Sequence, residues 1–243
     1  MTEDEVNYGD TFAYESIVGC FPGLDLSITW AVALQFTLFE AAIVFLSVYY
    51  GTFEAVSFLA GSTAVAVSSI GSYIMAIYGN RLRSLNLPDR YIKVVFGSSI
   101  DVVLGVVAFC VFLTYHVVAV GTDRPNMIGR FLGNQVRPPV VFLMLLIIWD
   151  VCYRIGTAWW ACVAGFWRAI SYGDEGWRFD DSTLRSLLRA DSAIVAFATL
   201  QLALVPFVLG IPLIEFAVTG HVAAVYLFSA VTFYLTYRKL GNG

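Results

Sequence analysis

The sequence contains very little charge. Only 13% of its 243 residues are Asp, Glu, Lys or Arg, whereas 59% are hydrophobic, and the mean hydropathy is +0.76. A soluble domain has roughly a quarter charged residues, so this composition excludes an ordinary soluble fold. Lysine is scarcest, with Lys93 and Lys239 beside twelve arginines, and no basic footprint for nucleic acid is present. We therefore expect the lipid bilayer as a partner and expect no nucleic acid.

Motifs for several common chemistries are also missing. The four cysteines form no CxxC pair and no metal-ligand spacing, and two histidines are too few for a haem bundle or a three-histidine zinc site. The sequence has no P-loop, no dinucleotide fingerprint, no GxSxG or HExxH motif and no potassium-channel filter. We therefore expect no metal and no cofactor, and an enzyme is not favoured.

The sequence does contain long apolar stretches. A membrane-spanning helix needs about 20 mostly apolar residues, and six stretches meet this requirement. They cover approximately residues 26–50, 54–78, 92–120, 140–167, 193–216 and 221–237. The pattern predicts an all-α fold, a polytopic integral membrane bundle of six transmembrane helices in one domain, residues 24–243. The acidic segment before it, residues 1–23, contains TFAYESIVGCF, which fits a short interfacial helix.

The orientation follows from the positions of Lys and Arg, which gather on the cytoplasmic side of membrane proteins. The connections after the second and fourth spans and the C-terminal tail together contain ten such residues, and the other side contains three. With six spans, this asymmetry predicts that both termini are cytoplasmic and that the protein lies in the cell membrane.

Away from their ends, the predicted spans place four ionisable residues at membrane depth, in three helices. Asp150 and Arg154 occupy the middle of the fourth span, four residues apart, so they share a helix face and can pair. Each unpaired charge costs roughly 2.5–3.5 kcal/mol at the centre of a span. Glu40 and Asp101 lie in the first and third spans. Ionisable residues at this depth indicate a functional site by default, so we predict a polar core built from these four.

Small residues accompany two of these acids. Gly97, Asp101 and Gly105 recur every four residues on one face of the third span, where they permit close helix packing. The second span offers a stripe of serines, glycine and alanine, which predicts that it is the helix facing Asp101. On residue types alone, tight packing and a polar pathway explain this pattern equally well.

The fifth predicted span contains Pro206, Gly210 and Pro212, which should break or kink it. A broken helix frees backbone carbonyls, which transporters use to build substrate sites. Gln201 precedes the break and is positioned to donate hydrogen bonds into such a site. A kinked helix shaped to its neighbours is the alternative interpretation.

Three functions remain open. The first is a transporter or channel for a small ion or solute, with the polar core of Glu40, Asp101, Asp150 and Arg154 beside the broken helix. The second is a non-catalytic scaffold subunit, as a homo-oligomer or in a larger complex, in which the charges hold helices together. The third is a membrane-embedded enzyme that acts on a lipid or isoprenoid, with a carboxylate as general acid–base.

Overall fold

The computed structural model describes residues 27–51, 54–119, 122, 125–132, 137–171 and 179–240. Within these ranges the chain forms helices joined by short connections, and it forms no β-strand. The predicted interfacial helix and the acidic segment around it lie outside the described residues.

The described helices comprise long apolar elements and several short ones. They are α1 (Ile28–Tyr50), α2 (Ala55–Arg83), α3 (Asp89–Phe96), α4 (Ile100–Ala119), α5 (Met127–Leu132), α6 (Pro138–Ser171), α7 (Asp181–Gln201), a 3₁₀ turn (Leu202–Leu204), α8 (Val205–Val208) and α9 (Pro212–Leu240). Six segments are long and apolar enough to cross a membrane: α1, α2, α3 with α4, α6, α7 with α8, and α9. The prediction of an all-α chain with six such helices is confirmed for the described residues, and cytoplasmic termini stay a prediction.

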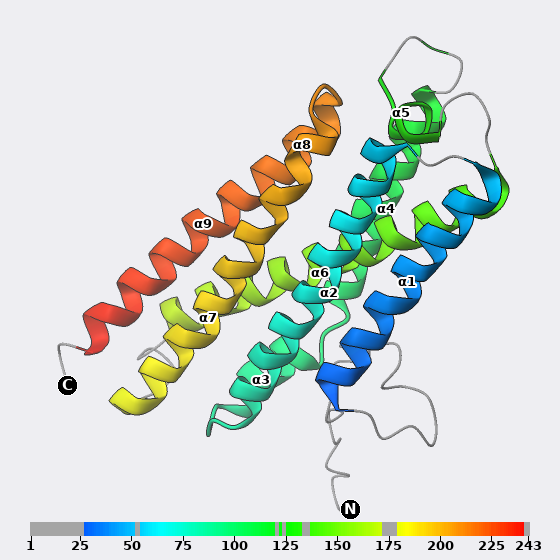
Figure 1. The fold of residues 1–243 in the computed structure, drawn as a ribbon. Helices are drawn as coiled ribbons and strands as arrows, with labels where there is room; N and C mark the ends of the chain where they lie inside the picture. Colours follow the sequence, from blue (N-terminus) through cyan, green and yellow to red (C-terminus); the bar gives the residue numbers. More distant parts are fainter. Residues whose placement is uncertain are drawn as a thin grey trace, which may run out of the picture.

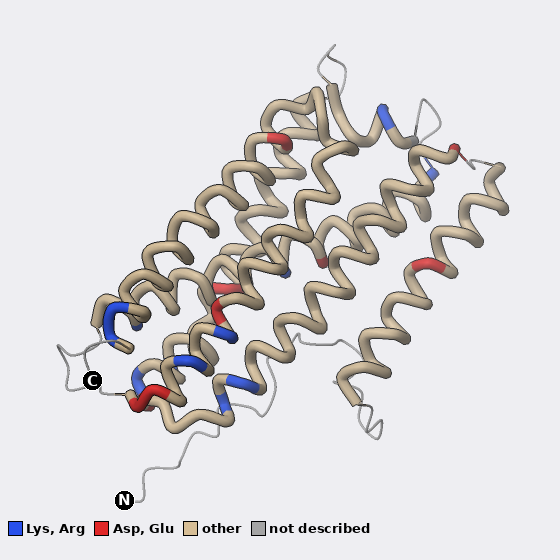
Figure 2. The backbone as a smooth tube through the Cα atoms, turned by 60° about the vertical axis from the view of Figure 1, so that its left-hand side comes forward, with Lys and Arg blue, Asp and Glu red and all other residues tan. Residues whose placement is uncertain are grey.

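The helices form a bundle with two distinct ends (Figure 1). The first turn of α1, the short helix α3 and the last turn of α9 lie at one end, called the α3 end below. Helix α5 and the turn between α8 and α9 lie at the other, called the α5 end. Helix α6 is the centre of the bundle, because it contacts α1, α2, α3, α4, α7 and α9. Most Lys and Arg residues gather at the α3 end (Figure 2).

The densest apolar core lies in the α3 half of the bundle. Tyr78, Leu82 and Tyr91 are completely buried there against Leu187 and other residues of α6 and α7. In contrast, α1 and α4 leave many large apolar side chains exposed, including Trp30, Val103 and Val107, which suits helices that face lipid. The bundle is therefore closed most firmly at the end that bears the arginines.

The predicted break at Pro206, Gly210 and Pro212 is present, but its interpretation as a break within one span is wrong for Gly210 and Pro212. Gly210 adopts a left-handed conformation (φ +80°), and Pro212 is the first residue of α9. A glycine after a helix and a proline at the start of the next are the usual residues of a turn. Gly210 and Pro212 therefore form the connection between the fifth and sixth spans, whereas Pro206 lies within the fifth span, in α8, just after the 3₁₀ turn that interrupts this span. The sixth span begins at Pro212, nine residues before its predicted start.

A break that the sequence analysis did not predict interrupts the third span. Helix α3 ends at Phe96 and α4 begins at Ile100. The carbonyl of Val94, near the break, accepts hydrogen bonds from the Ser98 hydroxyl at 2.8 Å and from the Trp160 indole at 2.9 Å. Carbonyls freed at a helix break must find partners inside the protein, and Trp160 of α6 supplies one here.

Helices α4 and α6 approach each other very closely at two glycines. A methyl group on Gly156 would lie 2.7 Å from the backbone nitrogen of Gly105, and one on Gly105 would lie 3.0 Å from the Cα of Tyr153. Only glycine allows this approach. The small-residue face of the third span therefore packs against α6, and the prediction that it faces the second span is wrong.

Candidate functional site

The predicted pair Asp150–Arg154 lies at the centre of a buried polar cluster. Arg154 Nη2 lies 3.3 Å from Asp150 Oδ1. The other carboxylate oxygen, Oδ2, accepts a hydrogen bond from the Gln35 amide at 2.9 Å and one from the Ser68 hydroxyl. All four side chains are buried. The cluster, named the Asp150 cluster below, joins the central parts of α1, α2 and α6.

These contacts explain how an apolar bundle accommodates two charges. Both oxygens of Asp150 have partners, and the arginine that neutralises it comes from the next turn of the same helix. Buried charges are tolerated when they are paired and hydrogen-bonded. Spacing along the sequence predicted Arg154, whereas Gln35 and Ser68 come from distant helices and were not predicted as partners of Asp150.

The other two predicted acids lie apart from the Asp150 cluster. Asp101 is in the first turn of α4, and its Oδ2 accepts a hydrogen bond of 3.4 Å from the Tyr153 hydroxyl of α6. Glu40 of α1 is only partly buried, and its Oε2 accepts a 2.8 Å hydrogen bond from Ser62 of α2. Each acid thus pairs with a different neighbour, and we find no contact that joins them into one core among the described residues.

Gln201 lies at the end of α7 and is fully buried. Neither Oε1 nor Nε2 of its amide has a hydrogen-bond partner among the described residues. A buried amide without a partner is costly. The sequence analysis placed Gln201 beside a substrate cavity, but it lines neither of the two cavities described next.

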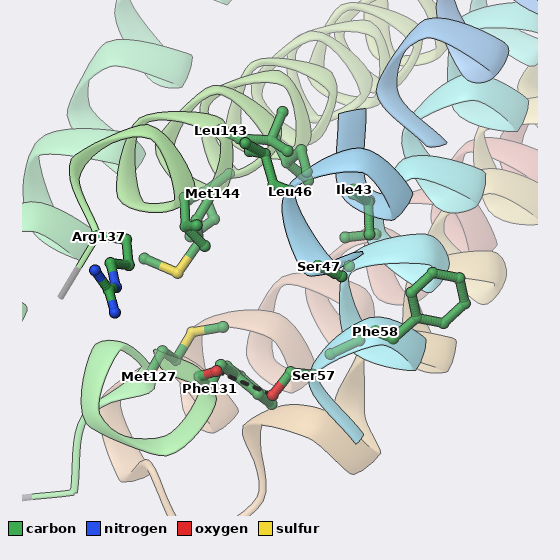
Figure 3. Close-up of a pocket in the computed structure, with 16 residues that line it drawn as sticks. Ile43, Leu46, Ser47, Ser57, Phe58, Met127, Phe131, Arg137, Leu143 and Met144 are labelled. Carbon is green, nitrogen blue, oxygen red and sulfur yellow. Dashed lines mark hydrogen bonds between the residues drawn. The ribbon is translucent and has the colours of Figure 1, made fainter. Parts of the chain in front are cut away.

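Two cavities occupy the α5 half of the bundle. The smaller, about 140 Å³, lies among α1, α2, α5 and α6 (Figure 3), and the larger, about 300 Å³, lies among α2, α4, α6, α8 and α9. Ile147 lines the smaller, Val151 lines the larger and Ile148 lines both, so the cavities reach the turn of α6 that contains Asp150. Among the residues that the structure describes, no Asp or Glu lines either cavity.

Helix α5 covers both cavities and is fixed by side chains from its neighbours. Its Met127 lines both cavities. The Met127 amide donates to His116 Nε2 of α4 at 3.1 Å, and the Ser57 hydroxyl of α2 donates to the Phe131 carbonyl at 3.0 Å. Arg130 in turn donates to the carbonyl of Leu209 at 2.7 Å, in the turn after α8. Helices α2 and α4 and the turn after α8 thus hold this short helix in place.

A second buried ion pair lies toward the α3 end and was not predicted. Arg168 Nη2 of α6 lies 2.5 Å from Asp191 Oδ2 of α7, and Arg168 also donates to the hydroxyl of Tyr91 at 3.0 Å. All three side chains are buried. Arg168 was assigned to the cytoplasmic loop because it follows an apolar run, and Asp191 was assigned to the polar segment before the fifth span. The only sequence signal for this ion pair was Asp191, an acid at the start of an apolar stretch.

Comparisons with known proteins identify the family. No curated protein matches the chain, and no solved structure matches it. A sequence model of the family of unknown function DUF7530 matches residues 7–232, which include nearly all of the bundle. The chain therefore belongs to the family of unknown function DUF7530.

Proposed function

We propose that the protein is a multi-pass protein of the cell membrane that transports a small solute or an ion, with the Asp150 cluster as its polar core. The observation that carries this proposal is the contrast between the two halves of the bundle. The α5 half contains two cavities, the α3 half is densely packed, and the Asp150 cluster lies at the level where one changes into the other. A protein that exposes a site to one side at a time has this asymmetry.

In this proposal the Asp150 cluster supplies the groups that respond to a solute. Gln35, Ser68 and Arg154 hold one carboxylate from three helices, so movement of α1 or α2 relative to α6 changes its environment. The Arg168–Asp191 pair then acts as the closure at the α3 end, because α6 and α7 cannot separate there without breaking it.

The test is flux into liposomes that contain the purified protein, with protons and K⁺ as probes. The variants are Asp150→Asn and the double variant Asp150→Asn/Arg154→Gln, which removes both charges and leaves no unpaired one. We expect wild type to move at least one probe and both variants to lose that flux. Asp89→Asn, which removes an exposed acid at the α3 end, is the matched control and should keep it. A folded double variant with wild-type flux would refute the proposal.

A non-catalytic scaffold is the second candidate, because both oxygens of Asp150 already have partners. A scaffold predicts that Asp150→Asn alone lowers the folded yield, that the double variant restores it, and that wild type moves neither probe. The lipid enzyme receives no support from the geometry, since neither Asp101 nor Asp150 lines either cavity.

A further inference from the structure

The smaller cavity combines an apolar interior with one cation at its edge. Arg137, the residue before α6, stands at that edge beside Met144 and across from Met127 (Figure 3). Apart from Arg137, the only polar side chains that line it in the described part of the chain are Ser47 and Ser57, and the Ser57 hydroxyl is bonded to α5. The Arg137 guanidinium also lies 5.4 Å from the ring centroid of Tyr50. The cavity thus presents one positive charge at the end of an apolar chamber.

The described residues that line the larger cavity are apolar, and among them the thiol of Cys152 and the thioether of Met127 are the only side-chain heteroatoms. Both cavities share Ala60 and Ala64 of α2, Met127 of α5 and Ile148 of α6. They are therefore adjoining chambers separated by these side chains, three of which are small or flexible. The larger chamber has about ten times the 30 Å³ that a water molecule occupies in the liquid, which suits a chain of about ten carbon atoms.

We infer that the two chambers form one binding site for an anionic amphiphile, a molecule with a single hydrocarbon chain and one carboxylate or phosphate head. The head pairs with Arg137, and the chain runs past Met127 into the larger chamber. Arginine is the residue best suited to this head, because its planar guanidinium binds carboxylate and phosphate oxygens through two parallel hydrogen bonds. Arg137 lies at the end of α6, so the head stays at the edge of the bundle and the chain follows the helices inward.

The role of this amphiphile as a transported substrate rests on the proposed function. Its binding to the two chambers does not, because binding is measured without a gradient. If laurate binds but wild type moves no probe, laurate included, transport alone is refuted. If ion flux depends on Asp150 but laurate does not bind, the inference alone is refuted.

The experiment measures saturable binding of radiolabelled laurate to the full chain in phosphatidylcholine nanodiscs, with empty nanodiscs as the background. We expect wild type to bind laurate above background and Arg137→Gln to bind it about tenfold more weakly. Arg137→Lys, which keeps the charge, should recover part of the loss. Dodecanol has the same chain without the charge and should compete equally well in wild type and Arg137→Gln.

The matched control is Arg189→Gln, which removes an exposed positive charge from α7 and should bind laurate like wild type. Ala64→Leu adds bulk between the two chambers and should weaken the binding of laurate and dodecanol alike. This variant therefore tests the contacts of the hydrocarbon chain separately from those of the charged head. Nanodiscs with added phosphatidylglycerol identify the source of the ligand: displacement of laurate assigns the site to a bilayer lipid, and no displacement assigns it to a free amphiphile. Absence of wild-type binding, or equal binding by Arg137→Gln, would overturn the inference.

Discussion

Replacing Gly156 with alanine should separate α4 from α6. The added methyl group would lie 2.7 Å from the Gly105 nitrogen, whereas ordinary contacts begin at 3.4 Å, so the helices must move apart by roughly 0.7 Å. Overpacking of this kind costs about 1–3 kcal/mol, and the close packing around the Asp101–Tyr153 hydrogen bond lies in the same interface. Alanine also favours the helix by about 1 kcal/mol over glycine. The change in the free energy of unfolding must therefore be compared with that of a Gly→Ala variant at a position where the methyl group has space.

Gly220 of α9 provides that control, since a methyl group there would lie 3.9 Å from the ring of Phe216. Gly105→Ala should fall between the two, because its methyl group would lie 3.0 Å from the Tyr153 Cα. The assay is reversible unfolding in mixed micelles with increasing SDS, which gives a free energy of unfolding for each variant. We expect Gly156→Ala to be about 1–3 kcal/mol less stable than Gly220→Ala. Equal stability of the two variants would show that α4 and α6 are not in close contact at this position.

Two further predictions use the same unfolding assay. Arg168→Ala or Asp191→Ala alone should lower the free energy of unfolding by about 3–5 kcal/mol, because each leaves a buried charge unpaired. The double variant Arg168→Met/Asp191→Leu should recover most of that loss. Additive losses in the double variant would contradict this account of the pair. Gly210→Ala should cost about 1–2 kcal/mol because its φ of +80° is unfavourable for a residue with a Cβ, while Gly220→Ala should not; an unchanged stability would show that the turn adopts another conformation.

The sequence predicted the number of helices that are long and apolar enough to cross a membrane, because an apolar run of about 20 residues has few other uses. It misplaced the boundary between the fifth and sixth spans because the turn there is itself apolar. Gly210 lies between Leu209 and Ile211, so hydropathy continues through the connection and only the conformation of the glycine marks it. The start of α7 was placed late for the opposite reason, since Arg185 and Arg189 lower the hydropathy of a segment that is helical.

The candidate site could be predicted only where its partners are close in sequence. Asp150 and Arg154 are four residues apart, and helical geometry alone places them together. Arg168 and Asp191 are separated by the connection between two spans, and their contact depends on how α6 packs against α7. The cavities could not be predicted from the sequence. A cavity forms where side chains from several helices do not fill the space between them, so it depends on the packing of all these helices.

The two ion pairs divide the bundle into regions that respond differently to a bound molecule. A ligand in the α5 half displaces apolar side chains around cavities that already exist, and this costs little packing energy. Opening the α3 half requires separation of α6 from α7 at Arg168 and Asp191 and exposure of the apolar core beside them. In the transport that we propose, the molecule therefore enters from the α5 end first, and its binding energy must offset the exposure of this core.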